Sequence, residues 1–145
     1  MLELPTVIDN YMKFNARKLT DKDYDLLVDW WKWWRWTPIP KNFLPDNGTG
    51  GIMIEKENIP IVAGFIYYTN SDAVVVEWIV SNPEYKNKDR KEAVEILLNT
   101  IEEVCKKQGK KYMFTIGRSE QLIKTHKKLG WAVDKNPSHE IVKVI

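Results

Sequence analysis

Cysteine is almost absent from this chain of 145 residues, in which Cys105 is the only one. A single cysteine excludes an internal disulfide and is typical of proteins in a reducing compartment. The chain also lacks an apolar run long enough for a membrane-spanning helix. Its first residues, MLELPTVIDN, have neither a basic segment nor a long apolar core, so we expect no signal peptide. These absences predict a cytoplasmic protein with no membrane partner.

Glycine-rich nucleotide motifs and metal-ligand clusters are missing as well. The seven glycines form neither a GxGxxG nor a GxxxxGK pattern. His126 and His139 with scattered acidic residues do not make a metal-ligand pattern, so no metal site is expected. The net charge is only +2, and the basic residues are confined to short segments. Nucleic acid is therefore a poorly supported partner, to be recognised by a steep salt dependence of affinity.

Tryptophan is the residue in excess, with seven in the chain. Residues 20–36 predict a helix that begins at the capping residue Thr20 and ends before Pro38. One face of a helix cannot bury five indoles, so some of them should lie at a rim or line a groove. The five are Trp30, Trp31, Trp33, Trp34 and Trp36. This segment predicts either a core helix with large side chains or an aromatic wall against a bound molecule or a protein partner.

A strand, a polar loop and a helix follow one another in residues 73–108. The β-branched run at residues 73–80 predicts a buried strand, which Pro83 closes because proline has no amide hydrogen. Apolar residues then recur at helical spacing: Val94, Leu97, Leu98, Ile101, Val104 and Cys105. The loop between strand and helix carries four positive charges and one negative charge within residues 86–91. Such a junction is where free amides and the positive end of a helix dipole can hold phosphates.

The remaining elements give the order of the whole chain. Strands are expected at residues 13–19, 52–55, 61–69 and 112–116, and a short helix at residues 119–129. Residues 131–133 and 140–145 predict a closing hairpin. The long loop at residues 37–51, with its prolines and glycines, predicts a functional segment. No linker divides the chain, so one domain is expected over residues 1–145. The fold class is α+β, with a mixed, mostly antiparallel sheet of six to seven strands and helices on both faces.

This order and three segments resemble the GNAT N-acetyltransferase superfamily. The segments are VEWIVSNPEYKNKDRKEAVEILL, KKQGKKYMFTIG and THKKLGW. The tryptophan-rich helix with its proline-rich loop is also similar to small acetyltransferase-like proteins of bacteriophages, which would act in the host cytoplasm. The resemblance implies acetyl-CoA as cosubstrate and an amine, either a small molecule or a protein, as acceptor. It also implies cofactor contacts at Trp78, Ile79, Val80, Lys86, Asn87, Lys88, Asp89, Arg90, Lys91 and Ser119.

The loop departs from the family pattern at both of its glycine positions. Asp89 and Lys91 stand there, and their side chains would crowd a backbone that glycine lets approach a phosphate closely. Asp89 also brings a negative charge. Lys86, Lys88 and Arg90 supply the charge that a diphosphate needs, so the loop is either a phosphate site or a plain solvated loop.

Two residues are candidates for proton transfer. Glu77 is the only acidic residue in the strand at residues 73–80, and is either a general base or an outward-facing residue paired with a lysine. The resemblance places His126 where the family has its tyrosine acid. It is either the acid or a surface histidine. Ser119 can either contact the cofactor or only cap a helix. The sequence leaves two functions open: an acetyl-CoA-dependent N-acetyltransferase, or a non-catalytic GNAT-like binding or virion-associated protein.

Overall fold

The computed structural model describes residues 14–145, and all statements about the structure refer to that range. The expectations about the first thirteen residues, including the absence of a signal peptide, lie outside the described residues. Across residues 14–145 no helix combines the length and the hydropathy that crossing a bilayer requires.

Five strands form one mixed sheet in the order β1-β2-β3-β4-β5. Neighbours from β1 to β4 are antiparallel, whereas β5 runs parallel to β4. The strands span Phe14–Lys18, Gly51–Lys56, Ile59–Tyr68, Ala73–Ser81 and Tyr112–Phe114. The α+β class and the mostly antiparallel sheet are therefore confirmed. The predicted six to seven strands are wrong, because the described sheet has five.

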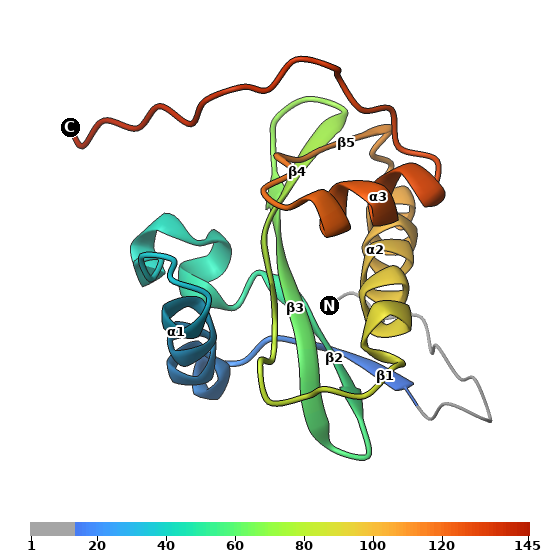
Figure 1. Ribbon diagram of the computed structural model, residues 1–145. Helices are drawn as coiled ribbons and strands as arrows, with labels where there is room; N and C mark the ends of the chain where they lie inside the picture. The colour runs from blue at the N-terminus through green and yellow to red at the C-terminus, as the bar shows by residue number, and fades with distance from the viewer. Residues whose placement is uncertain (1–13) are drawn as a thin grey trace.

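Helices cover both faces of this sheet (Figure 1). The helix α1 (Tyr24–Trp33) packs on one face, and α2 (Arg90–Lys107) and α3 (Glu120–Lys128) lie on the other. Three short 3-10 helices span Asp21–Asp23, Lys41–Phe43 and Pro45–Gly48. Two clusters of buried apolar side chains result, one on each side of the sheet. The α2 stripe is the helical part of the larger cluster, as the spacing of its apolar residues predicts.

The tryptophans of α1 divide between core and surface. Trp30 and Trp31 are buried, and Trp31 stacks on Phe65 of β3. Trp33 and Trp34 are exposed on 59% and 38% of their surface. The helix ends at Trp33, earlier than expected, because Arg35 has a positive φ of 63°. Trp34 thus leaves the helix and aims its indole N–H at β4.

The predicted closing hairpin is wrong. No strand is found after β5 in the described chain, and residues 132–145 run as an exposed extended segment, the C-terminal tail (Figure 1). The apolar side chains of Ile141 and Val144 are more than nine-tenths exposed. β5 has only three residues and therefore offers a short edge for pairing. The tail therefore has the alternating apolar and polar residues of a strand but pairs with no strand in the described chain.

Candidate active site

The site begins where β5 leaves β4. The ladder between these strands ends at the pair Val75–Phe114. Two residues further along each strand, the Ile116 amide donates instead to the Glu77 carboxylate, with N to Oε1 at 2.9 Å. Thr115 Oγ1 lies 3.2 Å from the same oxygen. A side chain has thus replaced the backbone partner, and the two strands are held apart from this point on.

A β-bulge lies at the same level of β4. The pairing with β3 shifts between Ala63–Val80 and Phe65–Glu77, so Gly64 alone faces two residues of β4. Trp78, one of those two, has a positive φ of 59°. A bulge re-aims side chains and backbone, and bulges are common beside functional sites. A Cβ on Gly64 would lie 3.2 Å from Ile79 Cγ1, a tight contact that the Ile79 side chain would have to relieve by shifting.

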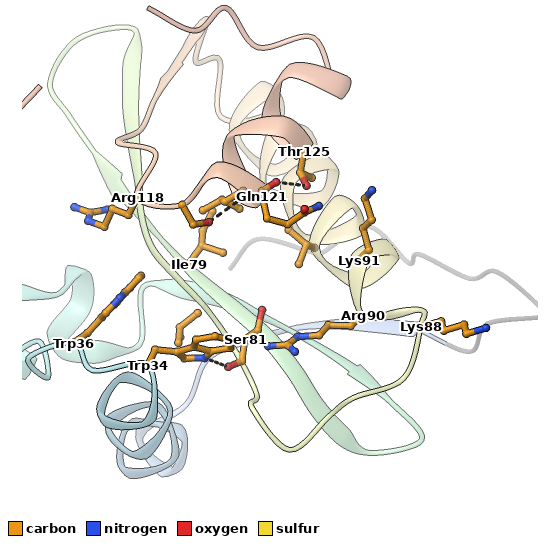
Figure 2. Close-up of a pocket in the computed structure, with 14 residues that line it drawn as sticks. Trp34, Trp36, Ile79, Ser81, Lys88, Arg90, Lys91, Arg118, Gln121 and Thr125 are labelled. Carbon is orange, nitrogen blue, oxygen red and sulfur yellow. Dashed lines mark hydrogen bonds between the residues drawn. The ribbon is translucent and has the colours of Figure 1, made fainter. Parts of the chain in front are cut away.

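A cavity of about 580 Å³ occupies the gap between the separated strands (Figure 2). It is bounded by the second half of β4, the amino end of α2, the amino half of α3 and the segment after α1. Its lining is formed by Trp34, Trp36, Ile79, Val80, Ser81, Lys88, Arg90, Lys91, Val94, Arg118, Ser119, Gln121, Leu122 and Thr125. A small second cavity shares Trp36, Ile79, Arg118 and Leu122 with it and adds Trp78, Thr115 and Ile116.

One end of the cavity is basic. Lys88, Arg90 and Lys91 come from the start of α2, where the helix dipole adds further positive potential (Figure 2). The Arg90 guanidinium lies over the Trp34 ring, 5.2 Å from its centroid. Burial lowers the pKa of Arg90, although an arginine remains charged at neutral pH. This end of the cavity can therefore hold an anion such as a diphosphate.

Asp89 turns away from the cavity. Its carboxylate accepts hydrogen bonds from Lys56 Nζ at 2.6 Å and from the Tyr85 hydroxyl at 2.7 Å. Burial alone would raise the pKa of Asp89, but these two bonds lower it on balance. The negative charge of Asp89 is thus neutralised by Lys56. Lys86 and Asn87, two other residues of the predicted cofactor contacts, do not line either cavity.

The edge of β4 and the start of α3 form the middle of the cavity. Ile79 and Val80 line it, while Trp78 lines only the small second cavity. Ser119 caps α3, because its hydroxyl accepts the Leu122 amide at 3.1 Å. It also lines the cavity, and its contact with a cofactor stays a prediction. Trp34 closes the far side, with its indole N–H 2.8 Å from the Ser81 carbonyl oxygen (Figure 2).

Arg118 stands at the end of the cavity opposite the lysines (Figure 2). Its Nη2 is 2.6 Å from Glu77 Oε2 and also pairs with Glu140 of the C-terminal tail. The guanidinium lies over the Trp78 ring at 4.5 Å. Burial alone would lower the pKa of Arg118, but the two carboxylates raise it on balance. The sequence analysis missed this residue, and only the need of a buried Glu77 for a cation pointed to such a partner.

The two candidates for proton transfer lie outside both linings. Glu77 is buried and bound to Thr115, Ile116 and Arg118. His126 is buried against Trp131 on the inner side of α3, and its Nδ1 is 2.7 Å from the Leu122 carbonyl oxygen. Its Nε2 has no partner in the described chain, and burial lowers the pKa of His126. The described lining of the two cavities contains no Asp, Glu, His, Cys or Tyr.

Comparison of the fold with solved structures gives a consistent result. The ribosomal-protein-S18-alanine N-acetyltransferase from Escherichia coli matches with a TM-score of 0.65 at 15% identity, over 81% of this chain and 76% of that chain. An aminoglycoside acetyltransferase from a soil metagenomic sample matches with a TM-score of 0.64 at 10% identity, over 95% and 99%. A predicted acetyltransferase with acetyl-CoA from Clostridium acetobutylicum matches with a TM-score of 0.58 at 16% identity, over 88% and 96%. The chain has the GNAT acetyltransferase fold.

The similarity to these GNAT structures lies in the fold and not in the amino-acid sequence. No protein-family model and no curated protein matches the chain. The identities of 10–16% show the fold alone. The resemblance noted in the sequence is thereby confirmed for the GNAT fold, and the bacteriophage resemblance stays a prediction. Within residues 14–145, no group of three His, Cys, Asp or Glu residues is placed to hold a metal ion.

Proposed function

We propose that the protein is an N-acetyltransferase that uses acetyl-CoA and an amine acceptor. One observation carries the proposal: a cavity with a basic end lies between separated strands, beside an edge of β4 that β5 does not pair. Solved proteins of this fold include ones with CoA or acetyl-CoA bound. Their acceptors range from a ribosomal-protein alanine to aminoglycosides, so the fold does not choose the acceptor.

The residues present fit such a cosubstrate. Lys88, Arg90 and Lys91 would hold its phosphates at the start of α2. The β4 edge around Ile79 and Val80 would hold its pantetheine arm, because backbone groups there face the gap and not a strand. When bound, the thioester supplies an activated acetyl group. Trp36 and Trp78 at the far end would exclude water from it.

The described lining of the site presents no acidic residue or histidine for proton transfer. The reaction forms a C–N bond, breaks the C–S bond and moves one proton from the amine to the departing thiolate. Glu77 and His126 remain our proposed base and acid, but both lie behind the lining and would have to act through water. Thr125 and Ser119 are the hydroxyl groups that the cavity presents directly. An acceptor that arrives as a neutral amine would need no base for the attack.

A second function is favoured by the same observation. A protein that only binds a partner or a nucleotide-like ligand would need the basic end and the aromatic wall, but no acid or base. The exposed Trp33 at the end of α1 would suit a protein partner. In that reading the chain would be a non-catalytic or virion-associated protein. A bacteriophage origin and a location in the host cytoplasm are proposals of the same kind.

Calorimetric titration with acetyl-CoA tests the first function. We expect one site per chain, and release of CoA when an amine mixture is added. CoA without the acetyl group serves as the control for binding through the phosphates alone. No binding at millimolar acetyl-CoA would overturn the proposal, and binding without turnover on any amine would favour the non-catalytic function.

A further inference from the structure

We propose that Arg118 is a subsite for a carboxylate on the acceptor, and that Glu140 of the C-terminal tail occupies this subsite in the free protein. The acceptor class would then be amines that carry a carboxylate close to the reacting nitrogen. This inference rests on the proposed acetyl transfer for its meaning, but the carboxylate subsite itself can be tested without turnover.

The first step is the position of Arg118. It lies at the end of the cavity away from Lys88, Arg90 and Lys91, so it is not part of the basic end (Figure 2). It lines both cavities and therefore stands where they meet. A cosubstrate held by its phosphates at the basic end would place its reactive end here. An acceptor must reach that end, and Arg118 would be the cation that it meets.

The second step is the division of labour between the two carboxylates on Arg118. Glu77 is built into the fold, with 6% of its side chain exposed and with additional bonds from Thr115 and Ile116. Glu140 is different, because 46% of its side chain is exposed and it sits in the tail. Both pair with the same nitrogen, Nη2. Glu77 therefore fixes the guanidinium, and Glu140 covers its outward side.

The third step is the weakness of the tail contact. Beyond residue 136, the pair with Arg118 is the only hydrogen bond or ion pair that joins the tail to the rest of the described chain. Exposed ion pairs add little net stability, because water screens them and two side chains must be held in place. A ligand carboxylate in the same place would keep the charge balance of the cluster and could accept from Nη2 as Glu140 does, while Nη1 stays on the Ile116 carbonyl oxygen. Glu140 is therefore displaceable.

The aromatic surroundings strengthen the subsite. Trp78 lies under the guanidinium at 4.5 Å and keeps its plane in place. The Trp78 indole N–H donates to the Tyr67 hydroxyl at 2.7 Å, which in turn donates to the Phe43 carbonyl oxygen at 2.9 Å. Arg118 is thus pre-oriented by Glu77 and by a ring that is itself hydrogen-bonded. A preorganised cation loses little freedom when a carboxylate binds.

The experiment uses matched probes on the full chain. N-acetyl-L-phenylalanine carries a carboxylate, and N-acetyl-L-phenylalaninamide is its neutral counterpart; both are titrated by ligand-observed NMR. In the wild type we expect the carboxylate to bind more tightly than the amide. Glu140→Gln removes the competitor and should tighten the carboxylate about two- to fivefold, the range that an exposed ion pair provides, with no effect on the amide. Glu120→Gln, an exposed glutamate at the start of α3, is the charge-matched control and should change neither affinity.

Variants of the arginine complete the test. Arg118→Lys keeps a cation for Glu77 but loses the planar guanidinium, so it should weaken the preference for carboxylate over amide. If Arg118→Lys fails to fold, Glu140→Lys provides the second measurement, since it also frees Arg118 and should tighten the carboxylate. Equal binding of the two probes, or no change in Glu140→Gln and Glu140→Lys, would overturn the inference.

Turnover separates this inference from the proposed function. L-phenylalanine and L-phenylalaninamide are compared as acceptors with acetyl-CoA. Preference for the amino acid supports the subsite, and acetylation of both amines at equal rates overturns it while leaving the N-acetyltransferase function intact. Failure to bind acetyl-CoA would remove the proposed function, but the probe titrations would still decide whether Arg118 binds carboxylates.

Discussion

Glu77 Oε1 accepts the backbone N–H of Ile116 at 2.9 Å, at the level where β5 diverges from β4. A side chain therefore takes the place of the next backbone hydrogen bond between the two strands. The other carboxylate oxygen of Glu77 pairs with Arg118, which lies at the end of the cavity opposite the lysines. Glu77 thus holds the two strands apart and also fixes the arginine at the end of the cavity opposite the lysines.

Replacing Glu77 should therefore affect stability before it affects chemistry. Glu77→Ala leaves the Ile116 amide and part of Arg118 without a partner, and should lower the free energy of unfolding by about 2 kcal/mol. Glu77→Gln retains an oxygen for Ile116 and should cost less. Urea unfolding measures both. A Glu77→Ala variant as stable as the wild type would contradict the structural role, and a stable Glu77→Gln without turnover would instead support the role of base.

The basic end of the cavity predicts that two lysines of the same segment differ in their effect on acetyl-CoA affinity. Lys91 lines the cavity and Lys86 does not, although both lie in the same basic segment. Lys91→Glu should weaken acetyl-CoA about three- to tenfold, since it removes one favourable charge and adds an unfavourable one. Lys86→Glu makes the same change in net charge and should have a smaller effect. Equal weakening in calorimetry would assign the attraction to net charge and not to the cavity.

The Lys56–Asp89 pair predicts a pH effect on stability. The pKa of Asp89 is lower in the folded protein than in an unfolded chain. Its contribution is therefore fully present above the ordinary aspartate pKa of about 4 and is lost as pH falls through the lowered folded value. Thermal unfolding of the wild type and Asp89→Asn should differ at pH 7 and converge in acid. A difference that stays constant with pH would exclude this pair as its source.

His126 predicts a second acid-sensitive contribution. Burial lowers its pKa below the ordinary value of about 6.5, so the folded protein holds the neutral ring. Stability should be complete above about pH 6.5 and fall as pH decreases toward the folded pKa, because the unfolded state takes up the proton first. NMR titration should show one histidine with a lowered midpoint, and the signal should disappear in His126→Phe. A midpoint above 6.5 would contradict the buried position.

The same variant decides the proposed role of His126 in catalysis. If His126 is the acid, His126→Phe should reduce turnover while acetyl-CoA affinity is retained. If turnover follows only the fraction of folded protein, the histidine is a packing residue. Thr125→Val, which removes a hydroxyl from the lining beside it, provides the comparison.

Local patterns of the sequence predicted the centre of the fold closely. The β-branched run before Pro83 predicts β4 within one residue of its observed Ala73–Ser81, and Ser119 stands directly before α3 as its cap. These features depend on neighbours a few residues apart, such as helical spacing and a proline stop. The stripe of α2 is buried for the same reason.

Contacts between residues far apart in the chain could not be predicted from the sequence. Arg118 lies 41 residues from Glu77, and no spacing rule joins them. The orientation of Asp89, at the start of α2, depends on Lys56 of β2. The sequence could therefore show the negative charge of Asp89 but not the lysine that neutralises it. The predicted hairpin failed in the opposite way: its residues alternate like strands, yet a strand also needs a free edge of adequate length.

The Lys56–Asp89 ion pair also connects the start of α2 to the end of β2. Asp89 precedes the first residue of α2, and Lys56 is the last residue of β2, beside the turn into β3. A ligand bound at the start of α2 would change the geometry of the Lys56–Asp89 ion pair. The chemical environment of the adjacent turn at Glu57 and Asn58 would then change as well. Amide resonances of that turn, which lines neither cavity, are thus expected to report whether the cavity is occupied.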